Sequence, residues 1–521
     1  MRIKSVKVEG HPVLGSFFYP DFDLQTEKKD IATYFIGPNG SGKSFLFEVL
    51  VDILRSAIEV EKRDYTYELK IEHAGEELVV DGTSGKKPTY TNKEGRSQDY
   101  FLPQRILFYY SGDTKRPKQY LDDYFQRFRG RLIQGDEIEF PHFFYVGTEL
   151  IPFVLLTTLV YGEQLGSNEI WNILNIENAS EFQINIEPQS WYKTSFRDTI
   201  RFVEASPLFW GAMGEVASFL DKMASVAVHT ETQPTEFTFP DSDDPSIYDF
   251  ITLMKFDPRD FSLIRSTFPD PRMFFELLID CQTSGIFKDI SISLKKKNEG
   301  GYFNSKFLSE GEKQILLTLG FIQLMQQEQF IYFLDEPDTH LNPRWKYEFH
   351  RMLKNIVQVR PDAIELFIAT HDPLLISGLD ANNVVMVSRN ARSIELTQAP
   401  ESLMGKGIEA ILTSELFGLD TTLDYETKVK MLDRRKLLAM HLRGETLSPE
   451  DQDKLTELTQ ELELIDGIKP LEDPLYREFV KAIPPEEFST FYEQFLSEEE
   501  QEKRTEIAKS VLEKLSKNRK K

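Results

Sequence analysis

The sequence contains a single cysteine, Cys281, among its 521 residues. One cysteine supports neither an internal disulfide bond nor a cysteine cluster that binds a metal, so both are excluded. The sequence also lacks an apolar run of about 18 residues or more, the length that a membrane-spanning helix needs. The longest candidate, YVGTELIPFVLLTTLVYG, carries Glu149 and Pro152 and is expected to form a buried helix. We therefore expect no membrane association.

The N-terminus, MRIKSVKVEG, lacks the apolar core of a signal peptide and is instead typical of a first strand. We expect a cytoplasmic protein. Basic residues are scarce: 61 lysines and arginines face 85 acids, and the net charge is −24. Such a surface repels nucleic acid, so any nucleic-acid contact would use local basic patches such as FQRFRGRL or LKKKNEGG. Solvated surface is the favoured interpretation of both segments.

What the sequence does contain is a phosphate-binding loop. FIGPNGSGKS, residues 35–44, matches G-x-x-x-x-G-K-[ST] between an apolar run, IATYF, and a segment with the spacing of one helix face, FLFEVLVDILRSA. Glycines let successive N–H groups point at phosphate oxygens, and the helix N-terminus adds partial positive charge. Lys43 would reach the β- and γ-phosphates, and Ser44 would offer its hydroxyl to Mg²⁺. The residues expected to bind the nucleotide here are Gly37, Pro38, Asn39, Gly40, Ser41, Gly42, Lys43, Ser44 and Phe45.

A second motif lies at KFLSEGEKQILLTLGFIQLM, residues 306–325. Ser309 is well suited to cap a helix N-terminus, and Glu312, three residues on, completes a capping box. The apolar spacing that follows predicts a mostly buried helix. Taken alone, this pattern fits ordinary capping as well as it fits a binding role, and only the neighbouring motifs favour the second.

The third motif is an acidic pair at the end of an apolar run, FIYFLDEPDTHLNP. An all-apolar run is typical of a central parallel strand, and such folds bind ligands at the carboxyl ends of their strands. Asp335 would hold Mg²⁺, which prefers oxygen ligands, and Glu336 would orient or deprotonate an attacking water. A further strand, AIELFIAT, ends at His371, where the imidazole would hydrogen-bond the γ-phosphate.

In this order the motifs resemble those of the ATP-binding cassette ATPases. Gly37–Ser44 resembles the Walker A motif, Leu308–Gln314 the signature, Ile331–Glu336 the Walker B motif, Asp338–Asn342 the D-loop and His371 the switch histidine. The resemblance implies a P-loop α/β fold with ATP and Mg²⁺ as cofactors. It also implies two subunits facing head to tail, so that the signature of one closes over the nucleotide of the other.

The resemblance further implies a role for individual residues. These are Lys43, Glu336 and His371 for catalysis, Ser44 and Asp335 for Mg²⁺, and Ser309, Gly311 and Glu312 for the nucleotide held by the other subunit.

Spacing and departures from the common pattern indicate which branch of the family the sequence resembles. Lys43 and Ser309 are 266 positions apart, more than a transporter cassette requires, yet residues 113–285 lack the sustained heptads of SMC-type coiled coils. The segment DEPDTHLNP resembles the D-loop of the RecF-like and OLD-like members of the SMC group. Asn342 stands where most cassettes carry aspartate, and Glu310 replaces the first glycine of the signature pair. After the strand RILFYY no Q-loop glutamine is found.

The resulting fold class is α/β, an ATPase head with a mostly parallel sheet, a globular helical insert and a helical C-terminal extension. We expect an N-terminal ATPase lobe at 1–112, the insert at 113–285, a C-terminal ATPase lobe at 286–395 and the extension at 396–521. The extension is predicted to contain a helical hairpin, because SPEDQDKLTELTQELELI carries a narrow apolar stripe. Core packing is the favoured role of this stripe, and a partner interface is the alternative.

No nuclease site is recognised in the extension, because the one D-x-D pair after His371, Asp451 and Asp453, falls in the first turn of that capped helix. The stretch from ILTSELFGLDTTLDYET to DRRKLLA resembles the ATPases that accompany HNH-type nucleases in Septu and certain retron anti-phage systems. The resemblance implies an ATP-hydrolysing homodimer or larger oligomer that regulates a separate nuclease. The alternatives are a RecF-like ATPase that clamps DNA ends or gaps, and a nucleotide-gated scaffold that rarely turns over.

Overall fold

The computed structural model divides the chain into two compact units, Met1–Lys406 and Gly407–Lys521, which are described separately. The residues that the structure describes are 1–20, 32–93, 95–112, 121–136, 139–165, 168–187, 209, 212–236, 248–297, 300–325, 329–357, 364–390, 393–419, 421–443, 446–466 and 509.

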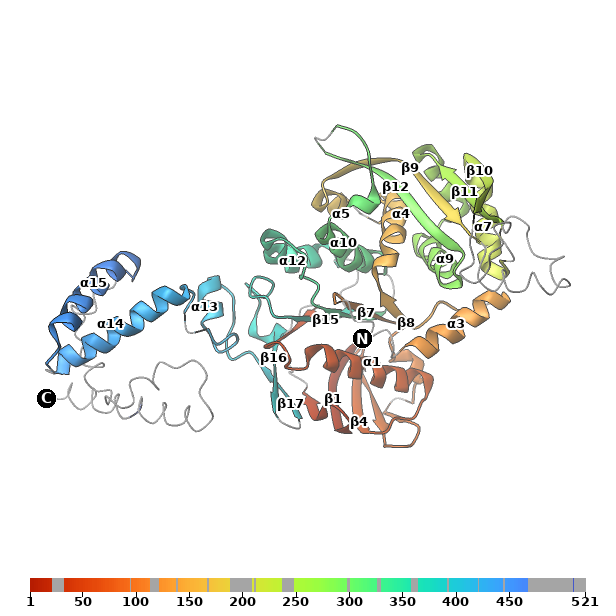
Figure 1. Ribbon diagram of the computed structural model, residues 1–521. Helices are drawn as coiled ribbons and strands as arrows, with labels where there is room; N and C mark the ends of the chain where they lie inside the picture. The colour runs from red at the N-terminus through yellow and green to blue at the C-terminus, as the bar shows by residue number, and fades with distance from the viewer. Residues whose placement is uncertain are drawn as a thin grey trace, which may run out of the picture. The chain divides into compact units, whose positions relative to one another are not determined.

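A twelve-stranded sheet forms the body of the first unit (Figure 1). From edge to edge its strands are β6 (Thr89–Asn92), β5 (Glu76–Gly82), β4 (Thr66–His73), β1 (Arg2–His11), β2 (Gly15–Tyr19), β17 (Ser393–Gln398), β16 (Val384–Asn390), β3 (Ala32–Ile36), β15 (Ile364–Thr370), β14 (Phe330–Asp335), β7 (Arg105–Tyr110) and β8 (Phe143–Val146). The run from β16 to β8 is parallel, whereas β6, β5, β4, β1 and β2 pair antiparallel. The predicted α/β fold with a mostly parallel sheet is confirmed.

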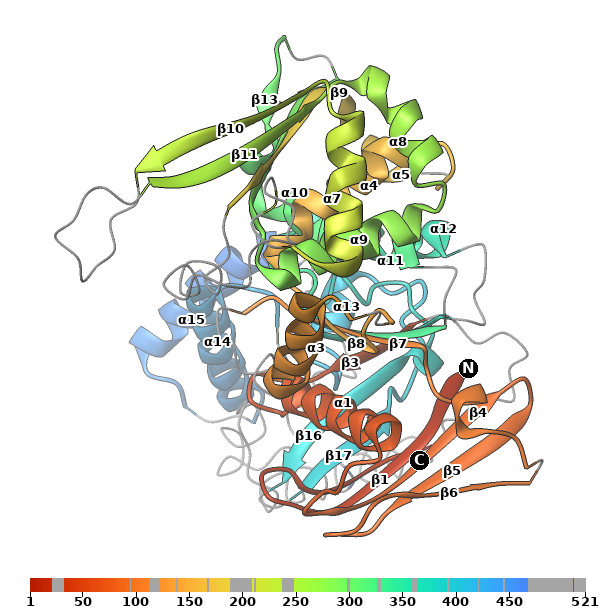
Figure 2. The ribbon, with the colours of Figure 1, turned by 90° about the vertical axis from the view of Figure 1, so that its right-hand side faces the viewer.

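The central strands are buried along their whole length because helices cover both faces of the sheet. Every residue of β3, β14 and β15 is buried, as the all-apolar runs in their sequences predicted. The helix α1 (Lys43–Glu59) lies on one side, and α10 (Glu310–Ile315) and α12 (Pro343–Ile356) lie on the other (Figures 1 and 2). The apolar residues that predicted α1 are all buried; they are Leu46, Val49, Leu50, Ile53, Leu54 and Ala57.

The helix predicted after Ser309 is continuous but not uniformly α-helical. The helix α10 leads into a π-helical turn, η5 (Leu316–Gly320), and then into α11 (Phe321–Met325). At Gly320, an added Cβ would lie 2.9 Å from Cγ1 of Val154, so this turn fits closely against the inserted segment. Short π-helical turns inside α-helices are frequent at functional sites.

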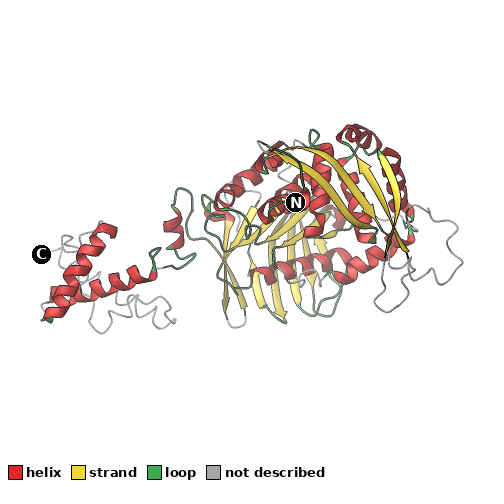
Figure 3. Ribbon diagram, turned by 45° about the horizontal axis from the view of Figure 1, so that its top comes forward, coloured by secondary structure: helices red, strands yellow, loops and turns green. Residues whose placement is uncertain are grey.

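The insert differs from the prediction, because residues 113–285 contain strands as well as helices. Its helices are α3 (Asp122–Gln134), α4 (Ile151–Tyr161), α5 (Asn168–Ile173), α7 (Gly214–Val226), α8 (Phe261–Thr267) and α9 (Pro271–Ser284). A second, antiparallel sheet has the order β10 (His229–Glu236), β11 (Tyr248–Phe256), β9 (Ile176–Ile186), β12 (Phe287–Lys296) and β13 (Phe303–Asn304). The two sheets are separate groups of strands in Figure 3.

The correction from a helical to a mixed insert has a physical reason. In β9 the side chains of Phe182, Ile184 and Ile186 are buried in alternation, which is the period of a strand. The apolar segment that forms β11 is compatible with an amphipathic helix as well as with a strand, because a short apolar run does not distinguish the two structures. Only pairing with β9 and β10 determines its conformation.

Strand pairing also crosses the predicted domain boundaries. The strand β8 lies inside the predicted insert but pairs with β7 in the main sheet, and β12 follows residue 285 but pairs with β9. The strand β17 runs to Gln398, beyond the predicted boundary at 395. The two lobes and the insert therefore share strands, and the structure places the second unit at Gly407 instead of 396.

The apolar stretch at 145–162 forms the end of β8 and the buried helix α4, as expected of a core element. Across the described ranges, no helix is both long and apolar enough to cross a membrane.

The second unit contains α13 (Ile408–Leu412), α14 (Tyr425–Arg443) and α15 (Pro449–Asp466). The predicted hairpin is confirmed, because Leu437 and Leu438 of α14 pack against Leu455 and Leu458 of α15. This packing uses part of the apolar stripe inside the unit itself.

A pH-dependent stability is expected from Asp280, a buried residue of α9. One of its carboxylate oxygens finds no hydrogen-bond partner within the described chain. Burial, together with the charges of Glu276 and Glu215, raises the pKa of Asp280 to about 8. The folded state therefore binds more protons than the unfolded state, whose aspartate pKa is about 3.9, and stability falls as pH rises between these values.

We expect Asp280→Asn to raise the free energy of unfolding, by roughly 1–3 kcal/mol at pH 8 and by less at pH 5. Thermal or denaturant unfolding at both pH values measures this difference, with the exposed residue Asp221, changed to Asn, as the control. An equal gain at both pH values would contradict the prediction.

Candidate functional site

The candidate site is built where parallel strands end. The loop after β3 leads into α1, the acidic pair Asp335–Glu336 ends β14, and His371 follows β15. Because β3, β15 and β14 are neighbours and parallel, these segments meet at one edge of the sheet, where α/β folds bind ligands.

The phosphate loop requires glycine at specific positions. Gly40 and Gly42 have φ of 84° and 99°, a left-handed conformation that favours glycine. Gly37 approaches β16 so closely that an added Cβ would lie 2.3 Å from the carbonyl oxygen of Val387. A side chain at any of these positions would therefore strain or displace the loop.

Lys43 is buried at the start of α1. Its Nζ donates hydrogen bonds to the carbonyl oxygens of Gly37, at 2.7 Å, and Pro38, at 3.3 Å. Burial lowers the pKa of Lys43, and the charges of Glu336 and Asp335 oppose this shift. The ammonium group therefore lies over the loop and close to both acids, as the phosphate-binding hypothesis requires.

Asp335 carries a buried carboxylate that the described protein groups do not satisfy. Its exposed fraction is 0%, and neither carboxylate oxygen finds a hydrogen-bond partner of good geometry. The pKa of Asp335 is raised to about 7, mainly by burial; Glu336 contributes to this increase, whereas the nearby Ser44 hydroxyl and Lys43 oppose it. An unsatisfied carboxylate beside a serine hydroxyl is a donor set that suits Mg²⁺, so Ser44 and Asp335 fit the ion.

Glu336 has an unusual backbone conformation. Its φ is 52°, in the left-handed region that costs a residue with a side chain about 1–3 kcal/mol. The strain is held by hydrogen bonds: the N–H of Glu336 donates to the carbonyl oxygen of Ala369 at 2.8 Å, and its own carbonyl accepts from Gln314 Nε2 at 3.3 Å. This conformation directs the carboxylate toward His371, whose Nδ1 donates to Oε1 at 2.9 Å.

Behind this pair, a charged network joins the D-loop to the end of β15. The hydroxyl of Thr370 donates to the buried carboxylate of Asp338 at 3.1 Å, and Lys346 pairs with Asp372 at 2.6 Å. The pKa of Asp338 is raised to about 6, mainly by burial; Asp372 contributes to this increase, and Lys346 opposes it. Thr370, which precedes His371, is thereby held by a hydrogen bond to Asp338, two residues after Glu336.

The capping box predicted at the signature is present. The N–H and hydroxyl of Ser309 both donate to Oε2 of Glu312 at 2.8 Å, and Lys296 pairs with Glu312 at 2.7 Å. Burial alone would raise the pKa of Glu312, but these contacts outweigh it and lower the pKa. No hydrogen bond joins Ser309 to Lys43 among the described residues, so the structure does not bring these two predicted site residues together within one chain.

The signature helix instead contacts the D-loop of its own chain. An added Cβ on Gly311 would lie 2.8 Å from the carbonyl oxygen of His340, so the glycine permits this close approach. The side chain of Gln314, buried to 2% exposure, contacts Glu336, His340 and Tyr109. The sequence analysis assigns no role to this glutamine, because its partners are distant in the sequence and no local pattern marks it.

The departures from the family pattern have local explanations. Asn342 caps α12 by accepting a hydrogen bond from the N–H of Trp345 at 3.0 Å. Glu310 pairs with Lys313 at 2.7 Å and is 61% exposed. At the Q-loop position, Ser111 lies beside the acidic pair, since its N–H donates to the carbonyl oxygen of Asp335 at 3.3 Å.

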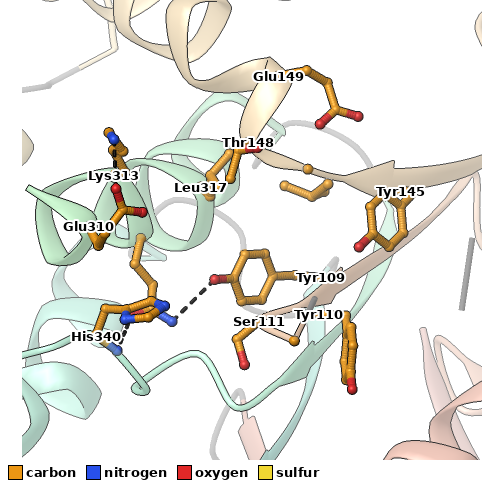
Figure 4. Close-up of a pocket in the computed structure, with 14 residues that line it drawn as sticks. Tyr109, Tyr110, Ser111, Tyr145, Thr148, Glu149, Glu310, Lys313, Leu317 and His340 are labelled. Carbon is orange, nitrogen blue, oxygen red and sulfur yellow. Dashed lines mark hydrogen bonds and ion pairs between the residues drawn. The ribbon is translucent and has the colours of Figure 1, made fainter. Parts of the chain in front are cut away.

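A pocket of about 310 Å³ lies next to this region, at the carboxyl ends of β7 and β8 (Figure 4). Tyr109 and Tyr145 line it from the two strands, and Glu310, Lys313 and His340 line it from the signature helix and the D-loop. The pocket is thus next to the groups that Gln314 joins.

A family model described as "AAA domain, putative AbiEii toxin, Type IV TA system" matches residues 33–377, about two thirds of the chain. This range contains each of the motifs assigned above, from the phosphate loop to His371.

Two curated proteins share shorter stretches with the chain. The Septu protein PtuA of Bacillus mycoides (strain KBAB4) is 32% identical over 146 residues, which cover 26% of this chain and 20% of that protein. Protein ea59 of Escherichia phage lambda is 26% identical over 115 residues, 22% of this chain and 21% of that protein. Each match thus spans about a fifth of the relative's length. The predicted similarity to a Septu ATPase is confirmed at this level.

Among solved structures, the SMC head domain from Thermotoga maritima is 13% identical with a TM-score of 0.31, covering 77% of this chain and 99% of that one. The Smc head domain bound to the C-terminal domain of ScpA, from Pyrococcus furiosus, is also 13% identical with a TM-score of 0.31, covering 76% and 96%. At these scores nothing about function follows from the likeness.

The unsatisfied carboxylate leads to a prediction for Asp335→Asn. We expect the variant to melt at a higher temperature than the parent in the absence of nucleotide at pH 8, because it removes an uncompensated buried charge. We expect it to lose most of the further stabilisation that Mg²⁺ adds in the presence of ATP. Thermal unfolding with ATP, with and without Mg²⁺, measures both effects.

The matched control is Asp372→Asn, which removes a carboxylate paired with Lys346 and should lower the melting temperature while leaving the Mg²⁺ increment in place. An Asp335→Asn variant that keeps the full Mg²⁺ increment would contradict the assignment.

Proposed function

We propose that this chain, which belongs to the AAA-domain family whose model matches residues 33–377, binds ATP with Mg²⁺ and hydrolyses it to ADP and phosphate. The observation that carries the proposal is the pairing of Glu336 with His371 at 2.9 Å, next to the buried, unsatisfied Asp335. A candidate phosphate loop, a carboxylate that fits Mg²⁺ and a candidate base then lie at one sheet edge.

The chain's own residues account for the steps of hydrolysis. The loop N–H groups and Lys43 would hold the β- and γ-phosphates. The Glu336 carboxylate would accept a proton from the attacking water as the bond between the γ-phosphorus and the ADP oxygen breaks. His371 would hold Glu336 in place and contact the γ-phosphate. Mg²⁺, held by Ser44 and Asp335, would neutralise phosphate charge.

We further propose that two subunits share each nucleotide. Within one chain Ser309 is bonded to Glu312 and not to Lys43, and Phe307, two residues before it, is 81% exposed. A large exposed aromatic side chain beside the signature is consistent with a surface that a second copy covers. The resemblance to cassette ATPases supports the same head-to-tail arrangement.

The most specific part of the proposal is a regulatory role for this ATPase. The similarity to the Septu protein PtuA supports an anti-phage function in which this ATPase controls a separate HNH-type nuclease. A retron setting, an oligomer larger than a dimer and a cytoplasmic location remain predictions.

Direct nucleic-acid binding is the less favoured function, because the net charge is −24 and two basic residues of each patch are paired with acids. Arg127 and Arg131 of the first patch lie within 4 Å of acidic oxygens, and so do Lys295 and Lys296 of the second. Salt-dependent DNA binding by the chain alone would favour the RecF-like clamp instead.

The first test replaces Glu336 by glutamine, which keeps the shape of the side chain but removes the base. We expect ATP turnover to fall by about 10²–10⁴-fold while ATP binding persists, so that an ATP-bound dimer accumulates. Phosphate release and size-exclusion chromatography measure the two effects. Glu395→Gln, an exposed acid in β17, is the control. Equal ATP turnover in the Glu336→Gln variant and the parent would favour the alternative function, a nucleotide-gated scaffold that rarely hydrolyses ATP.

The second test replaces Ser309 by arginine in the Glu336→Gln background. A bulky cation at the signature should abolish ATP-driven association while each subunit still binds ATP through Lys43. Sedimentation velocity and equilibrium binding of ATP separate these outcomes, and Ser262→Arg, on the exposed face of α8, is the control. Undiminished association of the Ser309→Arg variant would refute the shared site.

A further inference from the structure

The side chain of Gln314 is the place where three parts of the candidate site meet. Its Nε2 donates to the hydroxyl of Tyr109 at 3.1 Å and to the carbonyl oxygen of Glu336 at 3.3 Å. Its Oε1 accepts from the N–H of His340 at 2.9 Å. One buried amide thus joins the end of β7, the residue after β14 and the D-loop. The bonds that reach Tyr109 and His340 are two of the dashed lines in Figure 4.

Glycine at position 311 reinforces this connection. Gly311 and Gln314 lie on the same face of α10, and both contact His340, the glycine by close approach to its carbonyl oxygen and the glutamine by a bond to its N–H. The D-loop backbone is therefore held against the signature helix at two points one helical turn apart.

The hydrogen bond from Gln314 is accepted by the carbonyl group of Glu336, a residue with a strained backbone conformation. Glu336 keeps its φ of 52° only because neighbouring groups fix the peptide units on either side of it. On one side, the N–H of Glu336 is bound to Ala369, and on the other, its carbonyl accepts from Gln314 and from the Thr339 hydroxyl, at 3.0 Å. With the preceding peptide unit fixed, a change in φ would move this carbonyl and the side chain of Glu336 together, and the carboxylate would turn away from His371.

We propose that Gln314 is a positioning residue, which holds Glu336 in its left-handed conformation and so aligns the carboxylate for hydrolysis. This inference rests on the proposed function, in which Glu336 is the base. Because Ser309 begins the same helix, Gln314 also joins the signature of a subunit rigidly to that subunit's own Glu336.

A second buried glutamine, Gln323, is a matched control that tests whether Gln314 has only a structural role. Gln323 of α11 is also a buried glutamine on the same continuous helix, and its Nε2 donates to the carbonyl oxygen of Leu165 at 2.8 Å, in the inserted segment. Within the described part of the chain, no hydrogen bond joins Gln323 to a group assigned to the site. Replacing either glutamine by methionine keeps the volume and removes the buried hydrogen bonds.

We expect Gln314→Met to lower kcat by about 10- to 100-fold, because a misplaced base is less effective, with KM for ATP changed by less than about twofold. Gln323→Met should leave kcat and KM close to those of the parent even where it lowers the melting temperature. Equal effects of the two substitutions on kcat would overturn the proposal, since they would reflect general loosening of the helix.

A double-mutant cycle separates positioning from an independent contribution. In the Glu336→Gln background, Gln314→Met should lower single-turnover hydrolysis by less than about twofold, because the group that it positions is already absent. A further 10-fold loss in that background would overturn the proposal.

The cycle also distinguishes the two levels of inference. If Glu336→Gln leaves hydrolysis unchanged, the proposed function of Glu336 fails. If Glu336→Gln abolishes hydrolysis and Gln314→Met does not lower kcat, only the positioning role fails.

Discussion

The constraint on which the site depends is the burial of Asp335. An ionised carboxylate removed from water is costly unless a charge or hydrogen bonds compensate it, and the described protein groups give its two oxygens no hydrogen bond of good geometry. The nearest ammonium, that of Lys43, is bonded to carbonyl groups of its own loop. The site is therefore electrostatically incomplete by itself, and a divalent cation bound together with a polyphosphate would supply the missing charges of both signs.

The parts of the site that follow from local sequence could be predicted. The phosphate loop depends on glycines at fixed positions, the capping box on Ser309 and Glu312, and the buried strands on apolar runs that end at Asp335 and Thr370. Each of these features is determined by residues within a few positions of one another. The α/β fold follows from them, because an all-apolar strand needs a covered sheet.

The parts that depend on pairing between distant segments could not be predicted. The segment that forms β11 is apolar enough for either a helix or a strand, and the outcome depends on its pairing with β10 and with β9, which is about 70 positions away in the sequence. The role of Gln314 could not be predicted for the same reason, because its partners Tyr109 and His340 are distant in sequence and lie on different elements. No local pattern distinguishes this glutamine from an ordinary buried residue of an amphipathic helix.

The replacement of a signature glycine by Glu310 occurs at a position where a side chain can point outward, whereas the glycines that remain are at positions where a side chain would collide with another group. At Gly37, Gly42 and Gly311, an added Cβ would lie less than 3 Å from another group, so a side chain there would move the phosphate loop or the D-loop. Glu310, which replaces a glycine of the common signature, instead has its side chain exposed and paired with Lys313. The signature therefore has glycine at position 311, where the D-loop of the same chain comes close, and a charged side chain at position 310, on the exposed surface of the helix. A carboxylate on that surface would change what a second subunit meets there, without changing how the helix holds Glu336.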